Sequence, residues 1–206
     1  PRSRRGWRPR GRRDGRAPAI SPVALQAVRR IDALFDIERI GDAPAEPMGD
    51  GGRPLDGVRV LDLTRVIAGP VCGRTLAEHG AQVMRIAGPD LPFVPTLVMD
   101  TGRGKLSAHV DLSSDAGRGT LRELTRGADV FVQGYRPGAI ASRGFAPEQV
   151  AALRPGIVCV SLCAYGYDGP WQDRRGFDSL LQSVSGIAHE EGRAAGHDGP
   201  KHLPCQ

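Results

Sequence analysis

The sequence predicts an α/β fold in which a mostly parallel β-sheet is flanked by helices. Short apolar runs rich in β-branched residues, typical of buried strands, alternate with helical patterns at short spacing. That alternation indicates βαβ units, which build parallel sheets. The 28 Gly and 17 Pro residues are abundant, as expected for a chain with many tight turns between such elements.

Composition and cysteine usage argue against several other classes of protein. A chain of 206 residues that is 40% hydrophobic can build a globular core, which excludes a wholly disordered protein. No apolar run approaches the roughly 18 residues of a membrane-spanning helix, so we expect no membrane partner. The four cysteines lack CxxC spacing, which argues against a disulfide scaffold or a zinc finger and favours a reduced, cytoplasmic setting.

The net charge of +5 comes from the N-terminal segment. Residues 1–17 hold eight Arg against one Asp, whereas the rest of the chain is mildly acidic. We expect residues 1–20 to be a basic, disordered tail, the usual behaviour of such a composition. A nucleic-acid-binding protein led by this tail is the alternative from another class, and the composition favours it less.

Residues 21–53 are expected to hold a helix and a linker. Ser21-Pro22 is typical of an N-cap followed by the first helical residue, and apolar residues then recur at near-helical spacing. This pattern predicts an amphipathic helix over 22–39. Residues 41–54 are rich in Pro and Gly, which indicates a linker.

From Leu55 onward the sequence predicts regular alternation of strands and helices. The apolar, β-branched runs predict strands over 58–63, 82–86, 106–112, 128–134 and 157–163. Proline or capping residues at the start and glycine or arginine at the end predict helices over 70–79, 115–126, 147–153 and 177–188. Parallel sheets bind ligands at the carboxyl ends of their strands, so the loops after 63, 86, 134 and 163 are the expected functional loops.

The first two of these loop regions carry groups suited to an anion. Residues 64–70 lead from a strand into a helix, whose N-terminus attracts anions, although no GxGxxG fingerprint is present. The segment GRGKL (102–106) resembles a P-loop only superficially, since Leu106 stands where Ser or Thr would bind magnesium. Arg103 and Lys105 remain either phosphate contacts or solvated charges.

Two later motifs also allow two interpretations each. Tyr135 and Arg136 in GYRPG could stack on and pair with a nucleotide, or the segment could be a turn shaped by Pro and Gly. Asp178 stands at the start of a predicted helix, where an acid caps the helix and favours its dipole, so the residues alone favour a structural role over a functional one. The late histidines match no zinc template, so we expect no metal site.

Four segments, taken in order and spacing, resemble one protein family. They are PLDGVRVLDLTR (54–65) with AGP (68–70), GKLS with DL (104–112), ADV with YRPG (128–138), and YGYDGP leading to GFD (165–178). The resemblance is to the class III coenzyme A transferases, the CaiB/BaiF family, and it covers about 54–206. It implies a Rossmann-like large domain, two interlocked subunits, and coenzyme A or acyl-CoA bound as a substrate without a permanently bound cofactor.

The resemblance also assigns roles to individual residues. Coenzyme A is expected along the first loop, and the implied contacts are Val66, Ile67, Ala68, Lys105 near the phosphates, Tyr135 beside the adenine, Arg143 and Arg175. Asp178 falls on a supporting catalytic position near the thioester. The chain departs from the family pattern at Ile67, where Gln or Leu is common, and at Ala87-Gly88, where Glu and a basic residue are usual.

The implied reaction transfers coenzyme A between an acyl-CoA thioester and a carboxylic acid through an aspartyl-CoA intermediate. The family's nucleophilic Asp is expected just beyond Gln206, so we expect residues 54–206 to be the N-terminal part of a large domain, inactive by itself. The alternative within the family is a 2-methylacyl-CoA racemase. Racemases place His before the acid, whereas Phe177 stands here and cannot move a proton.

Overall fold

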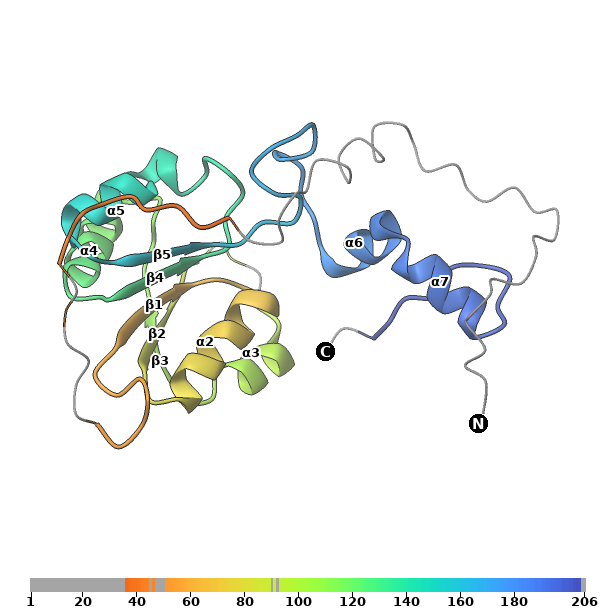
Figure 1. Cartoon of the computed structure of the whole chain (residues 1–206), viewed down its shortest axis with the longest axis horizontal. Helices are drawn as coiled ribbons and strands as arrows, with labels where there is room; N and C mark the ends of the chain where they lie inside the picture. The colour runs from red at the N-terminus through yellow and green to blue at the C-terminus, as the bar shows by residue number, and fades with distance from the viewer. Residues whose placement is uncertain (1–35, 45, 47–50, 90, 92, 205–206) are drawn as a thin grey trace, which may run out of the picture.

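Five parallel strands form a single sheet at the centre of the described chain (Figure 1). The computed structural model describes residues 36–44, 46, 51–89, 91 and 93–204. The strands are β1 (Arg59–Leu63), β2 (Gln82–Ala87), β3 (Lys105–His109), β4 (Val130–Gln133) and β5 (Val158–Ser161), in the spatial order β3-β2-β1-β4-β5. The predicted α/β class is therefore confirmed, and every predicted strand is present with slightly different ends.

Helices cover both faces of this sheet. On one face lie α2 (Ala68–Glu78) and α3 (Pro95–Thr101), and on the other lie α4 (Asp115–Arg126) and α5 (Pro147–Leu153) (Figure 1). A short 3-10 helix, η1, spans Ala141–Arg143. The sequence did not predict α3 or η1, because seven and three residues are too few to display a helical period.

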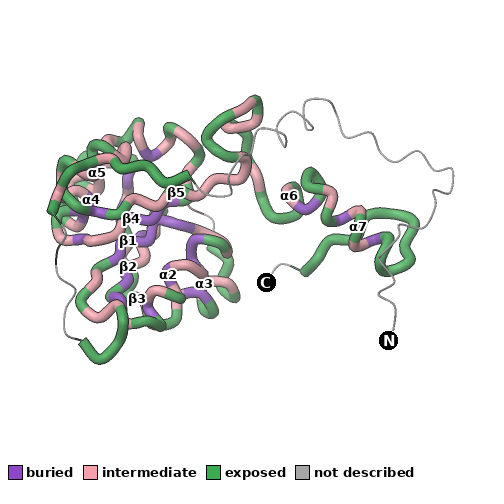
Figure 2. The backbone as a smooth tube through the Cα atoms, viewed as in Figure 1, coloured by how far each residue is buried: buried purple, intermediate pink, exposed green. Residues whose placement is uncertain are grey.

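The alternation of side chains along β1 divides the core into two layers. Leu61 and Leu63 pack with α4 and α5, where Leu121 and Val150 are fully buried. Val60 packs on the opposite face against α2, and Asp62 lies on that same face because strand side chains alternate. Figure 2 shows this burial running along the strands. The central strand therefore carries a carboxylate into the layer beneath α2.

A helical pair follows the sheet and lies beyond its end rather than on its faces (Figure 1). The pair consists of α6 (Asp178–Ser185) and α7 (Ile187–Ala194). The prediction of one helix over 177–188 was wrong, because Gly186 adopts φ 86° and ends α6. The buried Gln182 holds the chain beyond α7, since its amide accepts from Leu203 N–H at 2.7 Å and donates to Leu203 C=O at 3.2 Å.

Most of the predicted N-terminal features lie outside the described residues. These are the basic tail over 1–20 and residues 22–35 of the predicted helix. Residues 36–39 are described and are not helical, so the prediction that the helix continues to 39 was wrong. No helix in the described ranges is both long and apolar enough to cross a bilayer.

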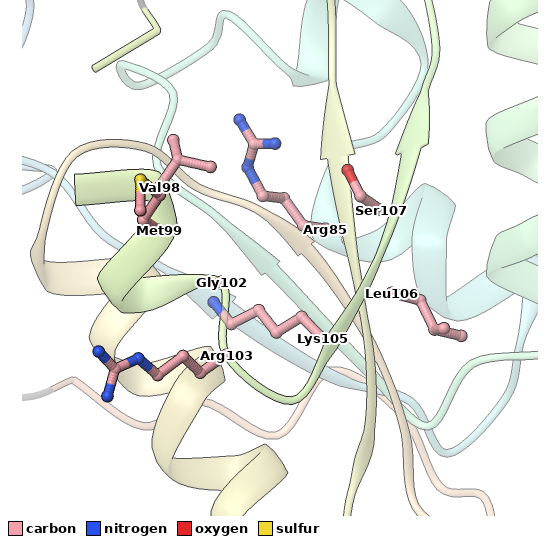
Figure 3. A pocket seen from close by; sticks show the side chains of 8 residues that line it. All are labelled: Arg85, Val98, Met99, Gly102, Arg103, Lys105, Leu106 and Ser107. Carbon is pink, nitrogen blue, oxygen red and sulfur yellow. The ribbon is translucent and has the colours of Figure 1, made fainter. Parts of the chain in front are cut away.

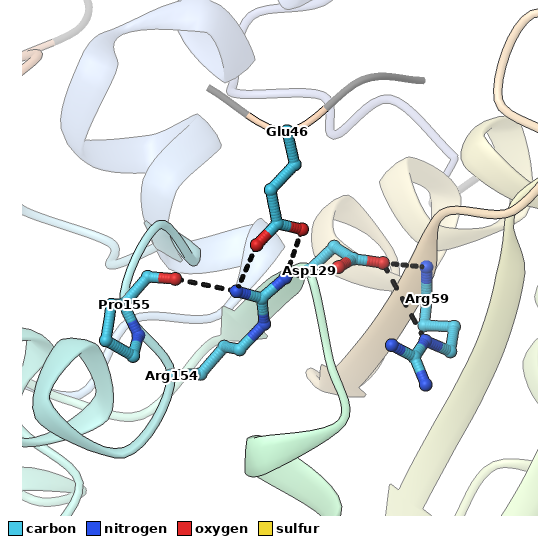
Figure 4. A network of polar contacts seen from close by, with 5 residues as sticks. All are labelled: Glu46, Arg59, Asp129, Arg154 and Pro155. Carbon is cyan, nitrogen blue, oxygen red and sulfur yellow. Dashed lines mark hydrogen bonds and ion pairs between the residues drawn. The ribbon is translucent and has the colours of Figure 1, made fainter. Parts of the chain in front are cut away.

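An ionic network joins the N-terminal segment to the amino edge of the sheet (Figure 4). Arg154 donates to both carboxylate oxygens of Glu46, at 2.7 and 2.6 Å, and to Asp129 at 3.2 Å. Asp129 in turn accepts from the Arg59 N–H at 2.8 Å, at the start of β1. Paired guanidinium and carboxylate groups give directional contacts, so this network fixes where the segment before β1 lies.

Replacing Glu46 should release this segment without unfolding the sheet. The hydrogen bond from Arg154 holds the pKa of Glu46 below its ordinary value. The contact is therefore present above the ordinary pKa of Glu and is lost as pH falls through the lowered pKa of the folded state. In Glu46→Gln, backbone ¹⁵N order parameters over 36–44 should be lower than in the wild type, and the thermal midpoint should stay unchanged.

The matched control is Glu38→Gln. Glu38 forms no hydrogen bond or ion pair within the described ranges, so its replacement should leave the order parameters over 36–44 unchanged. Equal order parameters in Glu46→Gln and the wild type would contradict the anchoring role of the network.

Candidate functional site

The carboxyl ends of the strands bring three loops together at one edge of the sheet. The buried Gln133 at the end of β4 joins two of them, because its amide donates to Tyr167 Oη at 3.2 Å and accepts from Tyr135 N–H at 2.7 Å. A Cβ on Gly134 would lie 3.7 Å from Thr64, the first residue after β1. The loops after β1, β4 and β5 therefore meet, as parallel strand order requires.

The loop between β1 and α2 has an unusual backbone conformation. Val66 has φ 68°, the only positive φ of a residue other than glycine in the described part of the chain. This left-handed region is sterically unfavourable for a β-branched residue. Ile67 precedes α2 with φ −126°, and no side chain caps the helix. Val66 and Ile67 are half-exposed and Ala68 is exposed, so the predicted loop is accessible at the edge of the sheet.

Two arginines flank the ring of Tyr135 beside this loop. The guanidinium carbon of Arg65 lies 4.8 Å from the ring centroid, and that of Arg143 lies 6.0 Å from it. Cations over an aromatic face are attracted by its quadrupole. The structure thus brings together two predicted site residues, Tyr135 and Arg143. It adds Arg65, which the sequence could have revealed because it follows a predicted strand within the first loop.

A cavity of about 260 Å³ lies between α3 and the strands β2 and β3, and its lining includes the amino end of β3 (Figure 3). Its polar lining includes Arg85 and Arg103, and its apolar lining includes Val98 and Met99 of α3. Arg85 also borders a second hollow that is lined by residues of the β1–α2 loop. Sequence reasoning missed Arg85 because a charge inside an apolar strand reveals its surroundings only once the neighbouring helix is placed.

Lys105 lies in a different environment from the expected one. Its side chain is 2% exposed, and its ammonium donates to Asp62 Oδ2 and to the Pro70 carbonyl, both at 2.7 Å. Contact with a phosphate would require the ammonium to leave both acceptors. The predicted phosphate contact stays a prediction, and Arg103, its neighbour in the motif, is the exposed cation.

Asp178 and Arg175 lie apart from this group. Asp178 is the first residue of α6 and lies in its first turn, where an acid favours the helix dipole as expected. The expected side-chain cap was wrong, because Phe177 stands at the N-cap and no side chain caps the helix. The Asp178 carboxylate accepts from Gln182 Nε2 at 2.6 Å. Arg175 is exposed in the segment before α6. Within the described ranges, no hydrogen bond or ion pair joins either residue to the loops at the sheet edge.

The buried ion pair influences Cys72 on α2. Burial raises the pKa of the Cys72 thiol above its ordinary value, the Asp62 carboxylate raises it further, and the Lys105 ammonium lowers it. The two charges therefore act on this thiol in opposite directions. The reactivity of the Cys72 thiol can therefore be used to detect a change in either charge of the ion pair.

Comparison with known proteins identifies the family of this fold and loop arrangement. Residues 55–204 match the family model described as CoA-transferase family III. The chain belongs to this family. It is 39% identical over 163 residues to the acetyl-coenzyme A transferase nodX of Hypoxylon pulicicidum, and 36% identical over 155 residues to the succinyl-CoA:glutarate CoA-transferase of Mus musculus.

A solved structure of a family III protein shares the fold. A CaiB/BaiF family protein from Brucella suis superposes with a TM-score of 0.62 at 30% identity, covering 66% of this chain and 40% of that one. The two curated relatives are matched over 77% and 69% of this chain but only 27% and 36% of their own length. The chain therefore spans less than half of the length of each of these three relatives.

Removing the side chain of Val66 should relieve backbone strain. A residue held in a sparsely populated region costs roughly 1–3 kcal/mol, whereas the extra freedom of glycine in the unfolded chain costs about 0.5–1 kcal/mol. Val66→Gly should therefore leave the free energy of unfolding unchanged or raise it by up to about 2.5 kcal/mol. Ile67→Gly, at an ordinary φ, should lower it by about 1 kcal/mol. Denaturant titration measures both, and equal losses would contradict strain at Val66.

The alkylation rate of Cys72 should follow the charges of the buried pair. Asp62→Asn removes the charge that raises the thiol pKa, so more thiolate forms at pH 8 and alkylation is faster. Lys105→Met removes the opposing charge and should slow it. Measured against pH with the other cysteines replaced by serine, the two variants should shift the profile in opposite directions. Shifts in the same direction would show that Cys72 has simply become exposed.

Proposed function

We propose that this chain forms the coenzyme A-binding part of an enzyme that transfers coenzyme A from an acyl-CoA thioester to a carboxylic acid. One observation carries the proposal: the strained β1–α2 loop lies at the carboxyl edge of the sheet, inside the region that matches CoA-transferase family III. Parallel sheets bind ligands at this edge. The names of the relatives support an acyl-CoA donor and a carboxylate acceptor.

The cations around the loop suit the phosphates of coenzyme A. Arg65 and Arg143 flank Tyr135, and Arg85 borders the hollow beneath the loop. Arginine pairs with phosphate through two parallel hydrogen bonds, and an aromatic ring offers a stacking surface for adenine. We place the main chain of residues 66–68 along the pantetheine arm and the nucleotide beside Tyr135. Coenzyme A is then a substrate that enters and leaves, not a resident cofactor.

The proposed chemistry exchanges one thioester for another through covalent catalysis. An aspartate carboxylate attacks the thioester carbon of the donor and the C–S bond breaks. This step releases the coenzyme A thiolate and forms an acyl-aspartyl anhydride on the enzyme. The thiolate then attacks the aspartyl carbonyl and releases the donor acid, which leaves aspartyl-CoA. The acceptor carboxylate reverses these steps. We propose that Asp178 supports this exchange rather than performs the attack.

The α6–α7 pair is the part of the chain best suited to meet a second subunit. Together with Phe177 directly before α6, it presents apolar side chains that are 37–55% exposed, namely Leu180, Val184 and Ile187. Contiguous exposed apolar side chains mark interaction surfaces. This supports the interlocked dimer implied by the family resemblance, in which Asp178 and Arg175 would approach a site completed by the partner.

Coenzyme A binding to the sheet edge tests the proposal directly. Tyr135→Ala should weaken binding by about 1–3 kcal/mol, the usual value of stacking on a base. Arg65→Gln should weaken it by about 1.5–3 kcal/mol through loss of a charge-assisted hydrogen bond. Calorimetry with coenzyme A measures both effects.

The matched control is Arg126→Gln. Arg126 ends α4, directly before β4 begins, and therefore lies at the amino edge of the sheet. Its replacement should leave affinity unchanged. Equal weakening by Arg126→Gln and Arg65→Gln would show nonspecific attraction of a polyanion and contradict a site at the carboxyl edge.

Replacing Asp178 should affect turnover rather than folding. Its carboxylate is exposed and accepts one hydrogen bond, so Asp178→Asn, which keeps an oxygen for Gln182, should change the free energy of unfolding by less than about 1 kcal/mol. In a transferase containing this chain, acyl exchange should fall at least tenfold. A loss of stability at normal turnover would assign Asp178 a structural role only. The same assay in deuterated water should incorporate no deuterium at the α-carbon, whereas incorporation would support the racemase.

A further inference from the structure

A buried ion pair lies beneath the β1–α2 loop. Asp62 points from the central strand β1 and Lys105 begins the edge strand β3, and their side chains are 1% and 2% exposed. β2 separates the two strands, so the lysine spans a full strand to reach the carboxylate. Its ammonium lies 2.7 Å from Asp62 Oδ2.

The ion pair is hydrogen-bonded to both ends of the β1–α2 loop. At the start of the loop, Asp62 Oδ1 accepts from the Thr64 N–H at 3.0 Å and from the Thr64 hydroxyl. At the other end, the Lys105 ammonium donates to the carbonyl of Pro70, in the first turn of α2, at 2.7 Å. One carboxylate and one ammonium therefore connect β3, the end of β1 and the start of α2.

The packing of α2 leaves no room for displacement of the pair. A Cβ on Gly73 would lie 2.6 Å from Asp62 Oδ2 and 2.8 Å from Lys105 Nζ. A Cβ on Gly69 would lie 2.3 Å from the Cβ of Thr64. Two glycines one helical turn apart thus allow the start of α2 to rest directly on the pair and on Thr64.

Such an arrangement accounts for the backbone of Val66. A strained conformation persists only where the surroundings over-determine it. The loop around Val66 is held at Thr64 and at Pro70 by the same two charges. A buried ion pair adds little net stability, because desolvation offsets its attraction, but its hydrogen bonds are directional. Its effect is therefore on the geometry of the loop.

We propose that Asp62 and Lys105 are positioning residues for coenzyme A. They hold the main chain of residues 64–68 in its binding conformation, and Lys105 acts through Asp62, Thr64 and Pro70 without touching the ligand. The ligand-binding half of this inference rests on the proposed function. The other half, that the ion pair holds the loop, rests only on the contacts described above. An experiment can therefore contradict one half and leave the other unaffected.

The first experiment needs no ligand. Amide hydrogen exchange is measured over 64–70, where the Thr64 N–H donates to Asp62 and is the protected amide, in the 206-residue chain and in Asp62→Asn, Lys105→Met and Gly73→Ala. We expect at least tenfold faster exchange over this loop in every variant, with no change over 121–125 of α4, which reports global unfolding. Gly73→Ala keeps both charges and separates loss of geometry from loss of charge. Unchanged exchange over 64–70 in the two charge variants would overturn the proposal.

The second experiment separates positioning from direct phosphate contact. Affinities for coenzyme A and 3′-dephospho-coenzyme A are measured for the same variants and for the double variant Asp62→Asn/Lys105→Met. The effects of substitutions within one hydrogen-bond network on affinity are not additive. Both single variants and the double variant should therefore lose affinity by the same factor, about tenfold, for both ligands. Tight binding by Asp62→Asn together with loss in Lys105→Met would make Lys105 a ligand contact and overturn the proposal.

The two experiments together distinguish the possible failures. Faster loop exchange in the variants, with no binding of coenzyme A even by the wild type, would refute the proposed binding function of this chain and leave the loop-holding role in place. Normal binding by all variants despite faster loop exchange would show that the loop does not position coenzyme A, and would overturn the inference alone.

Discussion

A carboxylate in the central strand of a parallel sheet must find its partners inside the protein. Asp62 is fully buried, and Leu61 and Leu63, which flank it in sequence, fill the opposite layer of the core. A buried charge without a partner is costly, and Lys105 and Thr64 satisfy both of its oxygens. Much of the local architecture follows from this requirement. The edge strand β3 must begin with a residue long enough to reach β1, and α2 must carry a glycine where it crosses the pair.

The same requirement shapes the surface where we propose that coenzyme A binds. Because Thr64 is engaged with Asp62 and Pro70 with Lys105, the residues between them form a short loop that is accessible at the edge of the sheet. Cationic side chains lie around this loop from three elements, with Arg65 in the loop, Arg85 on β2 and Arg143 on η1. Polar groups of the backbone and charges of the side chains therefore converge on one edge without a glycine-rich phosphate loop.

The rest of the chain is attached to this core by a few polar contacts. The segment before β1 is held at the amino edge through Glu46 and Arg154. The chain after α7 is held to α6 through Gln182. Both attachments use directional hydrogen bonds rather than extensive apolar burial, and the helical pair keeps apolar side chains exposed. The sheet with its four covering helices is thus the part that organises the site.

The sequence by itself determined the class of the fold, the five strands and the family. Periodicity and glycine or proline at the element ends are local signals, and the loops that follow the strands of a parallel sheet must share one edge. The family resemblance also named Tyr135 and Arg143, which the structure brings together, and their role in binding stays a prediction. Only the tertiary structure decided that Lys105 is buried against Asp62, that Arg85 borders the loop, and that Gly186 divides the last predicted helix. The physical reason is distance along the chain. Asp62 and Lys105 stand 43 residues apart, and whether a lysine meets solvent or a carboxylate depends on which strands become neighbours.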